Sequence, residues 1–219
     1  MAQLIEIYNS DSQEDTVYDM TCGSGSLLLK AADLAPHGIT IFGQENDNAT
    51  RGLAVMNMWL HNFATADIRL GNTLSNPQFL KEDTGELQPF DYAVANPPFS
   101  YKKWMNGLDP SNDIFKRFED YASPPAKNGD YAFLLHMIKS LKSKGKGCIV
   151  MPLGVLFRGN TEADIRKKLI GKGYIKAIVG LPANLFFGTG IAACLIVLDK
   201  EDADKRTHVF MIDASKGFI

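Results

Sequence analysis

Short apolar segments of β-strand character alternate along this chain with segments of helical character. Candidate strands at residues 16–20, 40–43 and 68–70 are separated by candidate helices at 27–34 and 47–62. Parallel strands are joined through a crossover, which is usually a helix. The alternation therefore predicts a three-layer α/β fold, in which helices cover both faces of a mainly parallel, seven-stranded sheet.

The alternation breaks once, near the C-terminus. Candidate strands at 174–181 and 192–198 follow each other through the linker 182–190 with no helix between them. We therefore expect one strand in this region to run antiparallel, and residues 208–212 are a candidate for a further edge strand. No repeat or low-complexity linker divides the sequence, so residues 1–219 are expected to form a single domain.

A long polar segment lies between the fourth and fifth candidate strands. Residues 100–128 are rich in proline and asparagine, and a connection of this length is usually functional or disordered. An amphipathic helix is expected after it, from Tyr131 to Ser143, and the lysines near its end suit a helix C-terminus. Near the start of the polar segment, three residues are candidates for phosphate or base contacts, or else are ordinary surface and packing residues: Lys102, Lys103 and Trp104.

Polar turns follow the first four candidate strands. They are a glycine-rich turn at 21–26, Gln44-Glu45, Gly71-Asn72 and Asn96-Pro97-Pro98-Phe99. The carboxyl ends of parallel strands meet at one edge of a sheet, where ligands bind in such folds. We therefore expect these four turns to form one site.

The turn Asn96-Pro97-Pro98-Phe99 closes a short apolar strand at 92–95. Its two prolines remove two backbone donors and stiffen the chain, which leaves carbonyl oxygens beside an amide side chain and an aromatic ring. If Asn96 Oδ1 and the Pro97 carbonyl each accept an N–H of an exocyclic amine, they stabilise the positive charge that grows during methylation. Phe99 would stack on the ring. An ordinary strand-closing turn with a buried Phe is the alternative.

The glycine-rich turn opens a helix. Gly23 and Gly25 would let a ligand approach the backbone, and the helix points its N-terminal amides toward that ligand. Leu28 stands where a dinucleotide fingerprint has its third glycine. Asp19 would repel a pyrophosphate and attract an ammonium group. A tight structural turn without a ligand is the alternative reading.

Glu45 and Asn72 complete the expected cofactor site. Glu45 ends the second strand and would accept hydrogen bonds from ribose hydroxyls, and Asn72 would bind an adenine edge. An ammonium, a ribose and an adenine without a phosphate are the parts of S-adenosylmethionine. The sequence therefore favours this cofactor over a dinucleotide.

Composition narrows the class of protein. A net charge of −2 over 219 residues is unlike a free-standing DNA-binding protein, so a field that attracts nucleic acid has to be local or come from a partner. No apolar run reaches the ~18 residues of a membrane span, and no signal peptide is visible. Three scattered cysteines and four histidines without ligand spacing predict no disulfide framework and no metal site. A cytoplasmic protein without membrane contact is expected.

Four elements together resemble those of one family. They are Asp19-Met20-Thr21-Cys22-Gly23-Ser24-Gly25, Gln44-Glu45, Asn96-Pro97-Pro98-Phe99 and Asn184-Leu185-Phe186-Phe187-Gly188-Thr189-Gly190. From about Val17 to its end, the chain is similar to the modification (methylase) subunit of type I restriction–modification systems. These subunits are adenine-N6 DNA methyltransferases. The Asn-Pro-Pro-aromatic element also occurs in cytosine-N4, glutamine and RNA guanine methyltransferases, so the narrower assignment depends on residues 147–159 and 184–190.

The resemblance implies a Rossmann-like fold that binds S-adenosylmethionine and methylates N6 of an adenine flipped out of duplex DNA. It assigns the ribose to Glu45 and the cofactor adenine to Asn72. The residues that it assigns to the methionine part of the cofactor are Asp19, Thr21, Cys22, Gly23, Ser24 and Gly25.

The resemblance also implies how the target is held. Asn96 and Pro97 would bind the target amine in the turn that Pro98 stiffens, and Phe99 would stack on the base. Phe187 or Phe186 would form a further wall of the base pocket. The partners implied are duplex DNA and a specificity subunit, and a restriction subunit is left open.

Two departures from the family are visible. Relatives usually carry a helical region before the first strand, and a helical tail after the last that contacts the specificity subunit. Here about fifteen residues precede Thr16, and the sequence ends soon after Asp213. We therefore expect the catalytic core of a longer protein. An RNA or protein amine methyltransferase, and a cofactor-binding module that is inactive without partner subunits, remain alternative functions.

Overall fold

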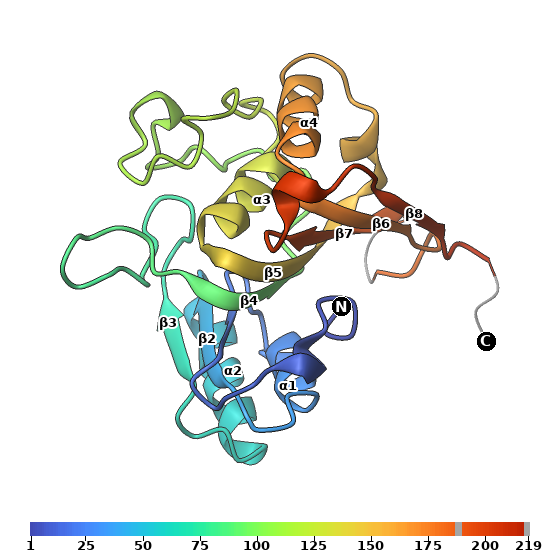
Figure 1. Ribbon diagram of the computed structural model, residues 1–219. Helices are drawn as coiled ribbons and strands as arrows, with labels where there is room; N and C mark the ends of the chain where they lie inside the picture. The colour runs from blue at the N-terminus through green and yellow to red at the C-terminus, as the bar shows by residue number, and fades with distance from the viewer. Residues whose placement is uncertain (187–189, 217–219) are drawn as a thin grey trace.

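Eight strands and four α-helices make up the computed structural model, which describes residues 1–186 and 190–216 (Figure 1). The helices are α1 (Ser26–Ala32), α2 (Asn48–Leu60), α3 (Asp130–Lys139) and α4 (Thr161–Gly171). The strands are β1 (Thr16–Asp19), β2 (Thr40–Glu45), β3 (Asp67–Leu70), β4 (Phe90–Ala95), β5 (Leu141–Pro152), β6 (Ile175–Gly180), β7 (Ala193–Asp199) and β8 (Phe210–Asp213). Short 3₁₀ turns lie at Ile7–Asn9, Pro110–Asn112, Leu153–Leu156 and Ala203–Lys205.

All eight strands belong to one sheet in the order β3-β2-β1-β4-β5-β7-β6-β8. The neighbours from β3 to β5 are parallel, whereas β7 runs antiparallel to both β5 and β6. The predicted mainly parallel α/β fold and its antiparallel strand near the C-terminus are confirmed. The described sheet has eight strands where seven were expected, because β8 pairs with β6 as a parallel edge strand.

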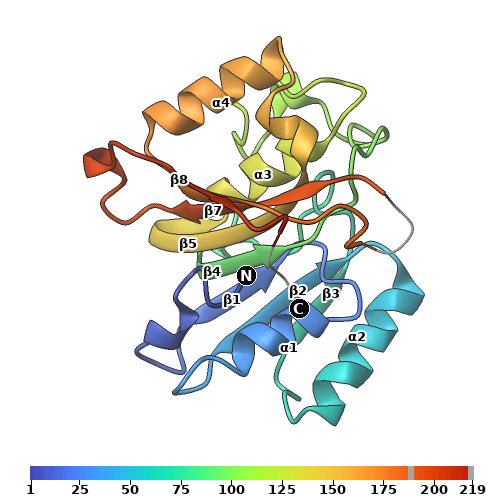
Figure 2. The ribbon, with the colours of Figure 1, turned by 90° about the vertical axis from the view of Figure 1, so that its right-hand side faces the viewer.

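Helices cover both faces of the sheet, with α1 and α2 on one side and α3 and α4 on the other (Figure 2). Successive residues of a strand point to opposite faces. Val17 of β1 accordingly packs into the core under α1, and Tyr18 into the core under α3. Because both faces are buried, the central strands are continuously apolar rather than alternating.

The helix predicted to reach Ser143 ends at Lys139, and β5 begins at Leu141. Leu141 pairs with Phe90 of β4, and a register shift follows along the pair. Of the lysines near the predicted helix end, Lys139 lies in the last turn of α3, whereas Lys142 lies on β5 and forms an ion pair with Asp91 at 2.7 Å. Strand pairing and ion pairs therefore override the helical pattern of the sequence.

The long segment after β4 is packed around one aromatic residue. Trp104 is completely buried, and its indole Nε1 donates to the Pro125 carbonyl at 3.0 Å. It packs edge to face with Phe118, at 6.0 Å between ring centroids. Trp104 is therefore a core residue rather than the phosphate or base contact considered from the sequence. Lys102 and Lys103 remain exposed. Among the described residues, no helix is both long and apolar enough to cross a membrane.

Candidate active site

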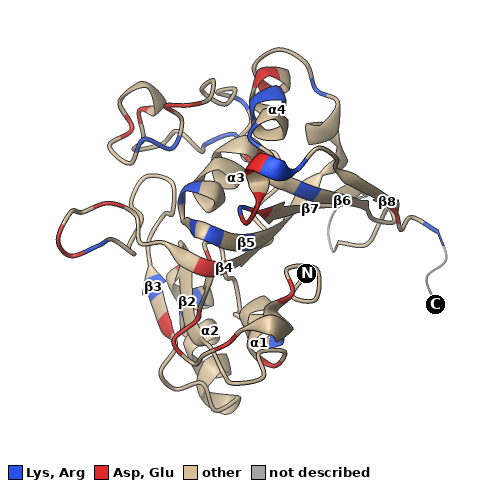
Figure 3. Ribbon diagram, in the orientation of Figure 1, with Lys and Arg blue, Asp and Glu red and all other residues tan. Residues whose placement is uncertain are grey.

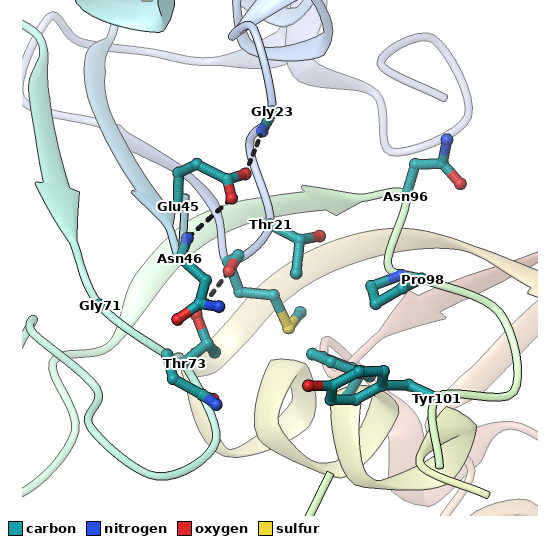
Figure 4. Close-up of a pocket in the computed structure, with 12 residues that line it drawn as sticks. Thr21, Gly23, Glu45, Asn46, Gly71, Thr73, Asn96, Pro98 and Tyr101 are labelled. Atoms are coloured by element: carbon teal, nitrogen blue, oxygen red, sulfur yellow. Dashed lines mark hydrogen bonds between the residues drawn. The ribbon is translucent and has the colours of Figure 1, made fainter. Parts of the chain in front are cut away.

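A cavity of about 440 Å³ opens at the carboxyl ends of β1, β2, β3 and β4 (Figure 4). All four polar turns of the sequence contribute to it, as expected for one edge of a parallel sheet. Asn96 and Gly23, which lie 73 positions apart in the sequence (96 − 23), line the same space. The lining residues are Met20, Thr21, Gly23, Glu45, Asn46, Gly71, Asn72, Thr73, Asn96, Pro98, Tyr101 and Phe133.

Glu45 holds two of these turns together. Its Oε2 accepts the Gly23 amide at 3.0 Å, and its Oε1 accepts the Asn46 amide at 2.8 Å (Figure 4). Oε1 also accepts the Asp47 amide at 2.9 Å. A carboxylate offers about four acceptor positions, so these three bonds leave about one for a ligand. Glu45 therefore connects the two turns through hydrogen bonds and also offers a hydrogen-bond acceptor to a ligand in the cavity.

The buried Thr21 Oγ1 makes no hydrogen bond of standard geometry with any described residue. It lies close enough to the Asp19 carboxyl to lower the pKa of that group slightly against the larger effect of burial. Asp19 lies behind this residue and accepts the Thr21 amide at 2.9 Å. Burial raises the pKa of Asp19 to about 7, with a contribution from the nearby Glu45 carboxylate. A buried acid poised in this way gains from a cationic ligand, which would favour its ionised form.

The two glycines of the first turn have different roles. Gly23 lines the cavity with a φ of 56°, and a Cβ atom built there would meet nothing within 4 Å. Gly25 does not line the cavity and has a φ of 79°; its Cβ would lie 2.5 Å from the methyl carbon of Met58. Gly25 therefore lets α1 approach α2, whereas Gly23 leaves open space beside the cavity.

Other residues assigned to the cofactor lie outside the cavity lining. Cys22 is buried, and burial raises the pKa of its thiol. Ser24 is exposed, and its hydroxyl contacts that of Ser26 at 2.8 Å. Neither side chain reaches the cavity, and Asp19 acts from behind Thr21.

Asn72 lines the cavity, but its side-chain oxygen is already engaged. Oδ1 accepts the amides of Leu74 and Ser75 at 2.9 and 3.3 Å, which leaves the NH₂ group to donate to a ligand. Arg117 supports the same turn from below, since its Nη2 donates to the Leu74 carbonyl at 2.8 Å. Arg117 is completely buried and forms an ion pair with Asp113 at 2.7 Å.

The Asn96–Phe99 turn carries two acceptors that face no protein donor. Among the described residues, neither the Asn96 side chain nor the Pro97 carbonyl takes part in a hydrogen bond. Phe99 is half-buried, lies outside the cavity lining as Pro97 does, and packs edge to face with Phe186, at 5.6 Å between centroids. The structure thus brings Phe186 into contact with the Asn96–Phe99 turn, whereas Phe187 lies outside the described residues.

Four of the lining residues lie outside the motifs selected from the sequence, whereas Met20 and Gly71 belong to those motifs without having been given a role of their own. Asn46 and Thr73 adjoin selected residues, so extending each motif by one position would have found them. Tyr101 and Phe133 come from the long polar segment and from α3, which carry no cofactor motif. They supply aromatic surface for a planar group, and their placement depends on the tertiary fold.

The strand order and the cavity at the strand ends define a Rossmann-like methyltransferase. The model of the N-6 DNA methylase family matches residues 1–219, and the chain belongs to this family. A type I restriction–modification methyltransferase subunit from Streptococcus thermophilus superposes with a TM-score of 0.83 at 38% identity. The match covers 100% of this chain and 46% of that one.

Curated relatives agree with this assignment. The type I restriction enzyme MpnII methylase subunit of Mycoplasma pneumoniae is 35% identical over 98% of this chain and 41% of its own length. The MjaVIII methylase subunit of Methanocaldococcus jannaschii is 30% identical over 100% of this chain and 39% of its own. The chain therefore spans less than half the length of these relatives. A class I S-adenosylmethionine-dependent methyltransferase of Listeria monocytogenes shares the fold, with a TM-score of 0.74 at 19% identity.

The family implies S-adenosylmethionine as the cofactor, and the cavity residues fit it. The unpartnered Thr21 Oγ1 and the buried Asp19 suit the polar methionine end. Glu45 retains acceptor capacity for a ribose hydroxyl, and the Asn72 NH₂ group can donate to a ring nitrogen of adenine. Phe133 offers apolar surface beside it.

Proposed function

We propose that this chain is the catalytic core of a type I modification subunit, which methylates N6 of an adenine flipped out of duplex DNA. The observation that carries the proposal is the shared cavity, in which Asn96 and Pro98 lie across from Gly23 and Glu45. Membership in the N-6 DNA methylase family favours adenine over an RNA or protein amine. The single catalytic domain expected from the sequence is part of this proposal.

The target turn would act through its two free acceptors. Asn96 Oδ1 and the Pro97 carbonyl would each accept one N–H of the adenine amine, which weakens the delocalisation of the nitrogen lone pair into the ring. Bound S-adenosylmethionine supplies an electrophilic methyl group on a sulfonium. As the N–C bond forms and the C–S bond breaks, the two acceptors stabilise the positive nitrogen, which then releases a proton to water. Phe99 and Phe186 would hold the flipped base.

DNA affinity would come mainly from partners. The chain has a net charge of −2, and basic and acidic residues are interspersed over the ribbon (Figure 3). Such a surface supplies little of the phosphate attraction on which DNA binding depends. We therefore assign site recognition to a specificity subunit, with a restriction subunit as a further partner. A DNA substrate and partner subunits of this kind support a cytoplasmic location, which is part of the proposal.

The proposal is tested by methyl transfer. The chain is mixed with S-adenosylmethionine labelled in its methyl group and unmethylated genomic duplex DNA, with and without a type I specificity subunit. N6-methyladenine in the digested DNA is the expected product, in greater yield with the specificity subunit. Label that enters RNA or protein instead would contradict the proposal. Cofactor binding with no transfer in either mixture would favour a module that is inactive in this form.

A further inference from the structure

An ion pair between the buried Asp130 and the partly exposed Arg158 lies next to the proposed target turn. Asp130, the first residue of α3, accepts the backbone amide of Ser100 at 2.7 Å through Oδ1, and Ser100 is the residue that follows Phe99. Its Oδ2 binds Arg158 Nη1 at 2.8 Å. We infer that the Asp130–Arg158 pair is a positioning device that fixes the Asn96–Phe99 turn for methyl transfer. This inference rests on the function proposed above.

Ser100 is the point at which the turn is held. It adopts a left-handed φ of 51°, which residues other than glycine rarely do. Such a conformation persists only where the surrounding structure imposes it. Pro97 and Pro98 have no amide N–H, so the Ser100 N–H is one of few backbone donors through which the protein can anchor this turn. The Asp130 carboxylate uses that donor in a charge-assisted bond.

Arg158 is built into the site rather than resting on the surface. Its guanidinium packs on Gly154, where a Cβ atom would lie 2.8 Å from Nε. Its Nη1 also approaches Glu162 Oε1 at 3.4 Å, and its Nη2 approaches Ser100 Oγ at 3.4 Å. One guanidinium thus joins the segment after β5, the start of α4 and the residue next to the target turn.

The buried acids around Arg158 explain why its positive charge is needed to keep Asp130 oriented toward Ser100. The side chains of Asp130 and Glu162 are only 2% and 3% exposed, and Arg158 is the cation they share. Without it, two buried carboxylates would face each other, and Asp130 would lose the partner that orients it toward Ser100. A lysine keeps the charge but lacks the planar guanidinium, whose several N–H donors can reach both acids and Ser100 at once.

Two variants disturb the Asp130–Arg158 pair without removing a charge. Arg158→Lys removes the planar guanidinium, and Gly154→Ala displaces the guanidinium through its new methyl group. Each is expected to slow single-turnover methyl transfer roughly 10- to 100-fold, because small displacements of a reacting group cost this much. The affinity for S-adenosylmethionine should stay unchanged. The matched control is Arg166→Lys, another arginine of the same region, which donates to the Val155 carbonyl at 2.9 Å; it should transfer methyl at the wild-type rate.

A second readout does not depend on activity. Amide hydrogen exchange of Ser100, followed by NMR in the whole chain, should speed up at least about tenfold in Arg158→Lys and Gly154→Ala and not in Arg166→Lys. If the wild-type chain methylates no DNA, the proposed function fails, while the exchange of Ser100 still tests the anchoring. The inference is overturned if both variants keep Ser100 protected and transfer methyl normally. It is also overturned if cofactor affinity, melting temperature and the rate of methyl transfer all fall together in these variants, because the pair would then act on the whole fold rather than on the turn.

Discussion

The Glu45 carboxylate accepts the Gly23 amide at 3.0 Å, so the acid that ends β2 fixes the glycine turn that follows β1. These strands are parallel neighbours, and their last paired residues are Asp19 and Gly43. The pairing delivers both turns to the same edge of the sheet, and Glu45 then locks them together. Contacts within the protein therefore hold together the cavity proposed for the cofactor.

Replacing Glu45 by Ala should weaken the binding of S-adenosylmethionine. The change removes a charged acceptor that holds three backbone amides and faces the ligand, so a loss of roughly 10- to 100-fold in affinity is expected. Titration calorimetry measures the effect, with the exposed Glu82→Ala as the control. An unchanged dissociation constant in Glu45→Ala would remove Glu45 from the cofactor site.

Cofactor affinity should depend on pH through Asp19. The ammonium of S-adenosylmethionine favours the ionised acid, whose pKa in the ligand-free protein is about 7. Affinity is therefore expected to fall roughly tenfold between pH 8 and pH 6, as the carboxylate takes up a proton. Asp19→Asn should flatten this dependence. A pH profile that is the same in both proteins would show that Asp19 does not sense the cofactor.

The same shift predicts how the ligand-free protein responds to pH. The pKa of Asp19 rises on folding from 3.8 to about 7, so between these values the folded chain holds a proton that the unfolded chain has lost. The contribution of Asp19 to stability therefore falls as pH rises through this window. Urea unfolding of the wild type and Asp19→Asn should be compared at several pH values in this window. The pH-dependent difference between their free energies of unfolding should disappear toward pH 4.

Gly25→Ala and Gly23→Ala should separate packing from ligand binding. At position 25 the new methyl group meets Met58 and φ is 79°, so overpacking and backbone strain together should cost about 1–3 kcal/mol of folding free energy. At position 23 the space is open, and the strain of a φ of 56° is the main cost. Thermal melts should therefore show the larger loss in Gly25→Ala. The reverse order would contradict the roles given to the two glycines.

Arg117→Met should destabilise the fold and loosen the Asn72 turn. Asp113 would become an unpaired acid, and the Leu74 carbonyl would lose its buried donor. Breaking such a pair typically costs about 3–5 kcal/mol. Denaturant unfolding measures the loss, and the exposed Lys116→Met is the control. If the Asp113→Asn, Arg117→Met double variant is as stable as wild type, the cost belongs to the unpaired charge rather than to the turn.

The sequence predicted the sheet and its rim because local patterns determine both. Strands and helices can be recognised from apolar segments, and parallel pairing then places their carboxyl ends together. The boundary at Ser140 could not be predicted in this way, since the pairing of Leu141 with Phe90 decides it. The sequence left open whether Trp104 is a contact or a packing residue, because its packing partners Phe118 and Pro125 lie 14 and 21 positions further along the chain (118 − 104 and 125 − 104).

The residues that orient the Asn96–Phe99 turn could not be predicted from the sequence either. Asp130 and Arg158 belong to no recognised motif, and only the packing of α3 against the segment after β5 brings them to Ser100. Motifs identify groups that touch ligands, whereas the residues that orient those groups are set by tertiary contacts.

The most direct measurement is methyl transfer and cofactor binding by Asn96→Ala in the same preparation. The account predicts that single-turnover transfer to duplex DNA falls at least about 100-fold, because a preorganised acceptor at the reacting nitrogen is lost. The dissociation constant of S-adenosylmethionine should match that of the wild type. Transfer at the wild-type rate, or lost cofactor binding with transfer preserved, would contradict the claim that Asn96 binds the target amine.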